Sequence, residues 1–113
     1  MDDATRARFE SRARIIKAMA HPTRLFMVDE LGRGERCVAD LQQLVQADMS
    51  TVSKHLTVLK QSGIVRDDKC GSQVFYSLRC PCVLDFFDCV ESVMQTSLQD
   101  RLEVLVRNGR VSQ

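Results

Sequence analysis

Residues 48–78, DMSTVSKHLTVLKQSGIVRDDKCGSQVFYSL, begin with a helical pattern and end with a strand pattern. The apolar residues of the first half recur at three- and four-residue spacing. They are Val52, Leu56 and Leu59. Asp48 is a suitable N-cap and Gly63 a suitable stop, because glycine readily ends a helix. The stretch therefore predicts a helix over residues 49–62.

The second half of this stretch is typical of a β-hairpin. Residues 64–67 and 74–78 are strand-like, and Val74, Tyr76 and Leu78 alternate with Phe75 and Ser77. Gly71 lies in the turn between the two runs, where a hairpin favours glycine. We therefore expect a wing over residues 64–78.

The residues before this stretch predict three more helices, over 3–20, 23–31 and 38–46. His21-Pro22 separates the first two, because proline interrupts a helix but can begin one. The residues expected to face the core are Phe9, Ala13, Ile16 and Ala20, then Leu25, Val28 and Leu31, then Val38, Leu41, Leu44 and Val45. Two short helices followed by a hairpin, over residues 38–62 and 64–78, predict a winged helix-turn-helix.

A long helix is expected from Pro81 to about residue 107. Its apolar stripe consists of Val83, Phe87, Val90, Met94, Leu98, Leu102 and Leu105. A domain of 113 residues has little core left to cover six turns, so the stripe predicts pairing with a second copy. The expected fold is thus a single, mainly α-helical domain, 1–113, that dimerises through its terminal helices.

Charge and hydropathy narrow the class of function. The net charge is only +1, so nucleic-acid binding has to depend on local clusters of positive charge. No stretch approaches the ~20 apolar residues that a membrane span needs, and the charged first 14 residues do not resemble a secretory signal. We expect a cytoplasmic protein with no membrane partner.

The helix after Asp48 is the element expected to read DNA, because the second helix of this motif enters the major groove. Positive residues exceed negative ones from Ala47 to Arg66 by two. Hydroxyls, amides and positive charges of the helix and the wing are the expected contacts to bases and phosphates. They belong to Ser50, Thr51, Ser53, Lys54, His55, Lys60, Lys69 and Gln73. A merely polar helix face, with His55 as a packed histidine, is the alternative.

Two runs, KAMAHPTRLFMVDEL at 17–31 and ADMSTVSKHLTVLKQSGIVRDDKCGSQVFYSL at 47–78, resemble the ArsR/SmtB family of metal-responsive repressors. The resemblance covers roughly residues 15–79 and includes the helix-breaking HPTRL and the tyrosine-bearing strand. It implies a homodimer, a winged-helix fold and an operator with two-fold symmetry. Met49 departs from the pattern, because glutamine is frequent there, so one base contact is in doubt.

The resemblance also identifies candidate effector ligands. One family site, Cys-x-Cys-x-x-Cys at the third helix, is not carried over, since Cys37 is followed by Ala39 and Gln42. Some zinc-sensing relatives have an Asp-x-His pair just after the tyrosine-bearing strand, and Cys80 and Cys82 stand at those positions. The residues near Val93 and Thr96, where such relatives complete the site, are not ligands. Cys89, about one turn earlier, is the expected replacement.

Three thiolates without a nearby histidine favour a soft ion. As(III) or Sb(III) is the first expectation, followed by Cd(II), Pb(II) or Hg(II), and preference for arsenic comes from the family alone. Cys82 and Cys89 lie ~10 Å apart along a straight helix, which metal–sulfur bonds of ~2.3 Å cannot span. Either the first turn unwinds around Pro81, or Cys89 comes from a partner helix.

Other interpretations of the cysteines remain. The thiols of a repressor could instead form a redox or persulfide switch. A thiol enzyme would need a base near Cys80-Pro81-Cys82, and a zinc-stabilised interaction module would need a fourth ligand. The three cysteines could also be plain spacers in a helix pair. Cys37 and Cys70 are expected to be buried small residues or exposed ones.

Overall fold

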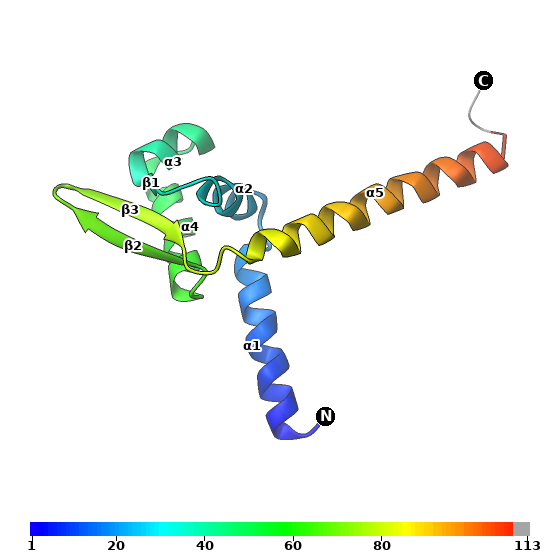
Figure 1. Ribbon diagram of the computed structural model, residues 1–113, viewed down its shortest axis with the longest axis horizontal. Helices are drawn as coiled ribbons and strands as arrows, with labels where there is room; N and C mark the ends of the chain where they lie inside the picture. The colour runs from blue at the N-terminus through cyan, green and yellow to red at the C-terminus, as the bar shows by residue number, and fades with distance from the viewer. Residues whose placement is uncertain (110–113) are drawn as a thin grey trace. The chain divides into compact units, whose positions relative to one another are not determined.

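The computed structural model describes residues 1–109, which form five helices and three strands (Figure 1). In chain order these are α1 Asp3–Met19, α2 Pro22–Leu31, β1 Arg36–Cys37, α3 Val38–Val45, α4 Met49–Gln61, β2 Val65–Cys70, β3 Gln73–Leu78 and α5 Val83–Arg107. The chain divides into two compact units, Met1–Pro81 and the part from Cys82 onward. The predicted helices and the hairpin are all present, with end positions that differ by at most three residues.

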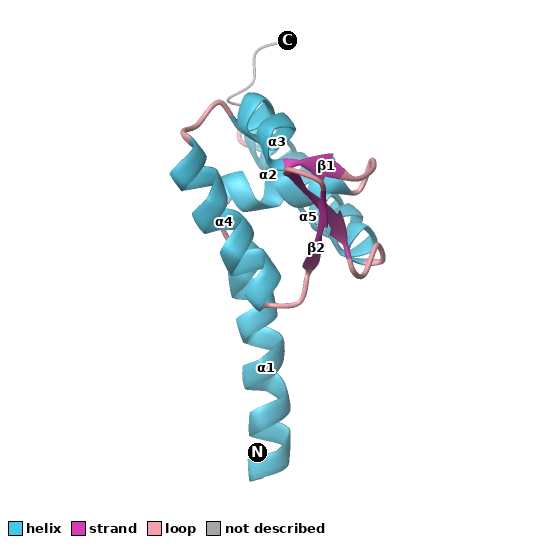
Figure 2. Cartoon of the chain, turned by 90° about the vertical axis from the view of Figure 1, so that its left-hand side faces the viewer, coloured by secondary structure: helices cyan, strands magenta, loops and turns pink. Residues whose placement is uncertain are grey.

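The sheet contains one strand that the sequence did not predict. β1 pairs antiparallel with β3, with Arg36 opposite Tyr76 and Cys37 opposite Phe75, so the strand order is β1-β3-β2. β2 and β3 form the predicted hairpin, in which Val65 pairs with Leu78 and Cys70 with Gln73. A strand of two residues has no recognisable periodicity, which is why β1 was missed. Figure 2 shows the strands beside α2, α3 and α4.

The core of the first unit is formed by apolar side chains of α2, α3, α4 and β2. The fully buried ones are Met27, Val28, Leu41, Val52, Leu56 and Leu59, with Val65 at 1% exposure. The predicted core face of α4 is therefore confirmed. α4 also ends as expected, because Gly63 takes φ +84° and the N–H of Ile64 donates to the Leu59 carbonyl at 3.1 Å.

Several residues predicted to face the core are exposed. Phe9 and Ile16 of α1 are 50% exposed, and Leu25 and Leu44 are 40% and 43% exposed. Ala13 and Ala20 are exposed as well. For the residues of α1, the reason is that this helix contributes only its C-terminal end to the core, where Ala18 and Met19 are buried. The helical spacing of these residues was therefore predicted correctly, but their burial was not.

The second unit consists of α5, which begins at Val83 rather than at Pro81. Cys82 is its N-cap residue, with φ −61° and ψ −12°, and the helix continues without interruption to Arg107. None of its residues is buried. No helix within residues 1–109 combines the length and the apolar character that a membrane span requires.

Candidate functional site

A residue in the left-handed helical conformation ends α3 and begins the turn to α4. Gln46 takes φ 59° and ψ 46°, and its N–H donates to the Gln42 carbonyl at 2.9 Å. This conformation is uncommon for a residue with a Cβ atom, but it ends a helix within one residue. α4 can therefore begin at Met49 and pack against α3, and Leu41, Val52 and Leu56 of these two helices are fully buried.

Asp48 organises the N-terminus of α4. Its carboxylate accepts from the Thr51 N–H at 2.7 Å and from the Ser50 hydroxyl at 3.1 Å. Hydrogen bonds from Thr51, followed by that from Ser50, lower the pKa of Asp48, so it stays ionised in neutral solution. Ser50 is exposed, and its hydroxyl can still accept a bond from a ligand while it donates to Asp48.

The predicted DNA contacts separate into two groups. Six of the eight side chains are exposed, namely Ser50, Ser53, Lys54, Lys60, Lys69 and Gln73. Thr51 and His55 are half-buried. Lys54 takes part in none of the ion pairs found among residues 1–109. The exposed group spans α4 and both strands of the wing, as the sequence analysis expected of a duplex-facing surface.

A groove of about 360 Å³ connects α4 to the wing. Ser53 and Gln73, which are twenty positions apart in the sequence, both line it. The other lining residues are Cys37, Val38, Ala39, Met49, Ser72 and Val74. Sequence reasoning identified Ser53 and Gln73 separately, but it missed Ser72 and Val74, whose position depends on the hairpin turn.

An ion pair fixes the end of α4 to the wing. The Lys60 ammonium donates to the Asp67 carboxylate at 2.8 Å, and both groups are partly exposed. This bond raises the pKa of Lys60 and lowers the pKa of Asp67. The pairing offsets one of the three positive charges between Ala47 and Arg66. Lys54 and Arg66, the other two, take part in none of the ion pairs found among residues 1–109.

His55 of α4 lies beside Arg24 of α2 and His21, the N-cap residue of α2. Its Nδ1 lies 3.2 Å from Nη1 of Arg24, and its ring centroid is 4.6 Å from that of His21. Burial, followed by the charges of His21 and Arg24, lowers the pKa of His55. Arg24 was not singled out from the sequence, because nothing in its local pattern indicates a partner thirty-one residues away.

The structure places the five cysteines in different surroundings. Cys37 is buried at the start of α3, whereas the other four are exposed, and all are free thiols. Cys70 ends β2, Cys80 follows β3, and Cys82 and Cys89 belong to the unit of α5. Among residues 1–109, no group of three His, Cys, Asp or Glu side chains within either unit is placed so that it could hold a metal ion.

The regular geometry of α5 limits what one chain can bind. Seven residues separate Cys82 from Cys89, and a rise of ~1.5 Å per residue places them ~10 Å apart along the axis. Pro81 and Cys82 precede the helix, and the Asp85 N–H donates to the Cys82 carbonyl at 3.1 Å. The chemistry of the thiols fits a soft ion. Because Cys82 and Cys89 are too far apart on a straight helix to share one ion, a shared site requires either a change at the first turn or a thiol from a second chain.

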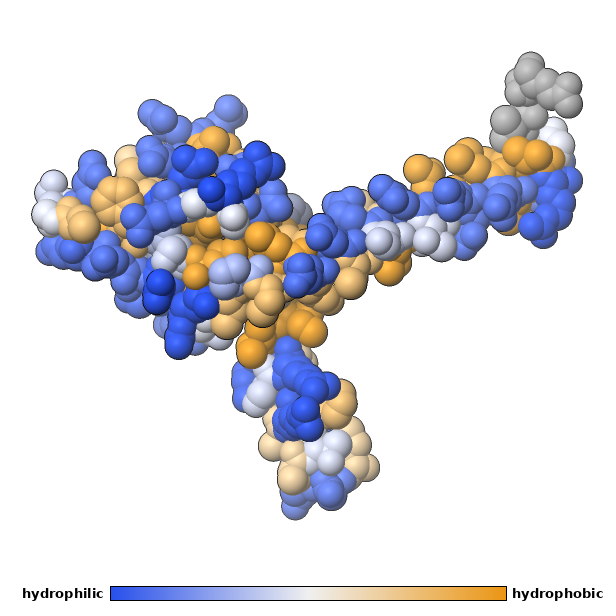
Figure 3. All heavy atoms as spheres, viewed as in Figure 1, coloured by the Kyte–Doolittle hydropathy of each residue, from blue (hydrophilic) through white to orange (hydrophobic). Residues whose placement is uncertain are grey.

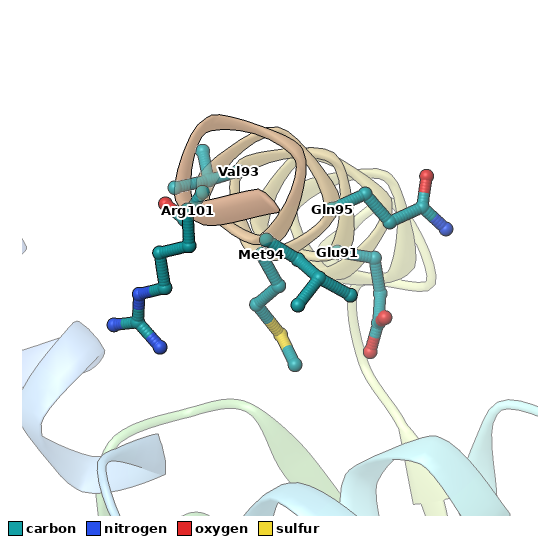
Figure 4. Close-up of a pocket in the computed structure, with 7 residues that line it drawn as sticks. Glu91, Val93, Met94, Gln95 and Arg101 are labelled. Atoms are coloured by element: carbon teal, nitrogen blue, oxygen red, sulfur yellow. The ribbon is translucent and has the colours of Figure 1, made fainter. Parts of the chain in front are cut away.

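Both terminal helices expose apolar side chains (Figure 3). On α5 these include Val93 at 65%, Met94 at 56% and Leu98 at 58% exposure. Met94 and Leu98 line a surface depression of about 510 Å³, and Figure 4 shows Met94 and Glu91 projecting from one side of the helix. On α1 the exposed residues are Phe9, Ile15 and Ile16. Exposed apolar stripes of this length are typical of protein–protein contact surfaces.

Comparisons with known proteins agree on one class. A family model described as "Bacterial regulatory protein, arsR family" matches residues 21–67, from the start of α2 to the wing. The chain is 38% identical over 78 residues to a biofilm growth-associated repressor of Xylella fastidiosa, covering 66% of this chain and 68% of that protein. It is 32% identical over 88 residues to a transcriptional repressor SmtB homolog of Synechocystis, covering 78% and 67%.

A solved structure shows the same architecture. It is the homodimeric winged helix-turn-helix DNA-binding domain of a possible ArsR-family transcriptional regulator from Mycobacterium bovis. The TM-score is 0.76 at 29% identity, and the match covers 88% of this chain and 93% of that domain. The winged helix-turn-helix fold predicted from the sequence is thereby confirmed.

Proposed function

The chain belongs to the ArsR family of bacterial regulatory proteins, and on this premise we propose that it is a transcriptional repressor of the cytoplasm rather than an enzyme. As a homodimer it binds operator DNA. It dissociates when a thiophilic ion, As(III) in the first place, binds the thiolates of Cys80, Cys82 and Cys89. The observation that carries the proposal is the exposed polar N-terminal half of α4, which includes Lys54 and lies beside the wing.

The surface of α4 supports duplex binding. In a helix-turn-helix the N-terminal residues of the second helix contact base edges in the major groove. Here Met49, Ser50, Ser53 and Lys54 are exposed at that end of α4. The groove between Ser53 and Gln73 continues this surface to the wing. Hydroxyl and amide groups suit base edges and phosphates, and Lys54 suits a phosphate.

The exposed stripes of α1 and α5 support a homodimer. Burying apolar surface stabilises an interface by roughly 25 cal/mol per Å². A second copy that covered the exposed apolar residues of α1 and α5 would therefore stabilise a dimer. Two copies would present two reading helices, and a two-fold operator places its half-sites ~34 Å apart. A change in the α5 pair would alter that separation.

The cysteine spacing supports an effector site that depends on the dimer. Cys80, Cys82 and Cys89 are exposed thiols, and thiolate ligands select soft ions over hard ones. Because α5 is regular, Cys82 and Cys89 of one chain meet a common ion only if the first turn opens or the partner supplies a thiol. Either route links ion binding to the arrangement of the two α5 helices.

Replacing Lys54 by alanine tests the DNA surface. We expect Lys54→Ala to weaken binding to duplex with little dependence on sequence, because a lysine–phosphate contact carries no sequence information. A dimer would lose two phosphate contacts, so the slope of log affinity against log salt should become shallower by ~2. Fluorescence anisotropy on a duplex selected by the wild-type protein, repeated over a range of salt concentrations, measures both quantities.

Arg8→Ala is the matched control, since it removes the same charge from the exposed first half of α1. It should leave the salt slope close to that of the wild type. Equal slopes for wild type and Lys54→Ala would contradict the placement of α4 in the groove.

Replacing the cysteines by serine tests the effector site. We expect Cys80→Ser, Cys82→Ser and Cys89→Ser each to retain duplex binding and to lose release by arsenite, because serine does not form the thiolate bond. In the wild type, arsenite should weaken duplex binding by about 5- to 150-fold, the usual range of coupling between two sites. Titration of the protein–duplex complex with sodium arsenite, under reducing conditions, gives this ratio.

Cys70→Ser is the control, because Cys70 is an exposed thiol on the wing and outside the proposed set. It should respond to arsenite as the wild type does. If all three serine variants still release DNA with arsenite, the ligand assignment is wrong. Release by oxidant or persulfide but not by arsenite would instead favour a redox switch at the same thiols, and mass spectrometry would show the modified cysteines.

A further inference from the structure

Three helices of the first unit meet at a polar cluster formed by Arg24, His55 and His21. Nε of Arg24, on α2, donates to the Ala18 carbonyl at 2.6 Å, in the last turn of α1. Nη1 of the same guanidinium lies 3.2 Å from Nδ1 of His55, in the middle of α4. One side chain thus connects the end of α1 to the helix that is proposed to read DNA.

The contact between Arg24 and His55 requires one protonation state. A guanidinium has only donors, so Nδ1 of His55 must accept and can carry no proton. The imidazole is then neutral, with its proton on Nε2. A guanidinium stays charged at any ordinary pH. The bond therefore exists only while His55 is uncharged.

The surroundings of His55 favour that neutral form. The ring of His21, the N-cap residue of α2, lies 4.6 Å away, and Nδ1 of His21 accepts from the Thr23 N–H at 3.1 Å. α1 presents the Ala18 carbonyl to the cluster, and the charges that act on His55 come from His21 and Arg24. Among the described residues, α3 and β2 add no charge that acts on it.

We propose that Arg24 and His55 are positioning residues for DNA recognition, holding α4 against α1 and α2 only while the His55 imidazole is neutral. This inference depends on the proposed function, because it gives α4 the role of reading helix. Protonation would place an N–H of His55 against the guanidinium donor and break the bond. DNA binding would then weaken in acid although no group that touches DNA has titrated.

The direction with pH follows from the lowered pKa of His55. The folded protein resists protonation below pH ~6.5, where an unfolded chain accepts the proton. The contribution of the cluster is therefore complete above pH ~6.5 and is lost as the pH falls below that value through the pKa of folded His55. The wild type should bind duplex with constant affinity from pH 7.5 to 6.5 and progressively more weakly as the pH is lowered further.

The test uses a duplex that the wild-type protein selects from a random pool at pH 7.5. Arg24→Met, which keeps the aliphatic stem, and His55→Leu, which lacks an acceptor, are each expected to weaken binding to it by ~10-fold. The double variant should be no weaker than Arg24→Met alone, because that variant has already lost the bond to His55. A His55 that only touched DNA would give effects that multiply.

His55→Asn supplies the conservative variant, since its amide oxygen can replace Nδ1 as acceptor but does not titrate. It should recover most of the loss seen in His55→Leu and should lose less affinity than the wild type between pH 7.5 and 5.5. Parallel pH profiles for the wild type and His55→Asn would overturn the inference, and so would multiplying effects in the double variant. This pH comparison stands even if Arg24→Met does not fold.

The two proposals fail in different ways. A wild-type protein that selects no duplex contradicts the proposed function and this inference together. A wild-type protein that selects a duplex but binds it without dependence on Arg24 contradicts the positioning role alone.

Discussion

Aspartate in place of Met94 and Leu98 is expected to turn the dimer into monomers and to abolish specific operator binding. Both side chains are more than half exposed on α5, where we propose that the second copy packs. Two carboxylates per chain in that interface would remove apolar contact and add repulsion between like charges. A monomer engages one half-site at a time, so affinity for the selected duplex should fall by at least ~100-fold.

Light scattering coupled to gel filtration gives the mass, and anisotropy gives the affinity. The matched control is Gln95→Asp with Gln99→Asp, which adds the same charges at the same spacing but one residue further around α5. The control should remain dimeric. A dimer that survives aspartate at Met94 and Leu98 would show that these residues lie outside the interface.

The second large effect is expected in the core. Leu56 has no exposed surface and lies on the inner face of α4. Leu56→Ala leaves a cavity and should cost about 2–5 kcal/mol of unfolding free energy. Domains of this size have only about 5–15 kcal/mol in total, so the variant should be partly unfolded near body temperature.

Thermal unfolding followed by circular dichroism, at one protein concentration, measures this loss. Leu44→Ala is the control, because it makes the same chemical change at a residue of α3 that is 43% exposed. Its transition should stay within a few degrees of the wild type, whereas that of Leu56→Ala should fall by roughly 10 °C or more. Equal shifts would mean that α4 does not pack as described.

The parts of the fold that could be predicted are those that depend on residues close together in the sequence. Asp48 and Gly63 bracket α4, and both act through bonds to residues a few positions away. Spacing alone also identified the buried residues Val52, Leu56 and Leu59. The same holds for the exposed DNA candidates on α4, since a residue opposite an apolar stripe is exposed in most packings.

The candidate effector site shows the limit of such reasoning. The sequence places Cys80, Cys82 and Cys89 within ten residues, and the helical rise is enough to separate the last two. The start of α5 at Val83 is a structural result, because the sequence left open an unwinding at Pro81. In the proposed site, convergence of the thiols requires a change at the first turn of α5 or a thiol from a second chain, and one sequence carries no local sign of either.

By itself, the sequence determined the order of the five helices and the two wing strands, the caps of α4 and the residue types on its surface. These features depend on neighbours within about four positions, where spacing and chemistry act directly. Only the tertiary structure decided that α1 leaves Phe9 and Ile16 exposed, that β1 joins the sheet and that Arg24 bonds to His55. Each of those depends on segments distant in the chain meeting in space, and the packing of the whole unit determines which segments meet.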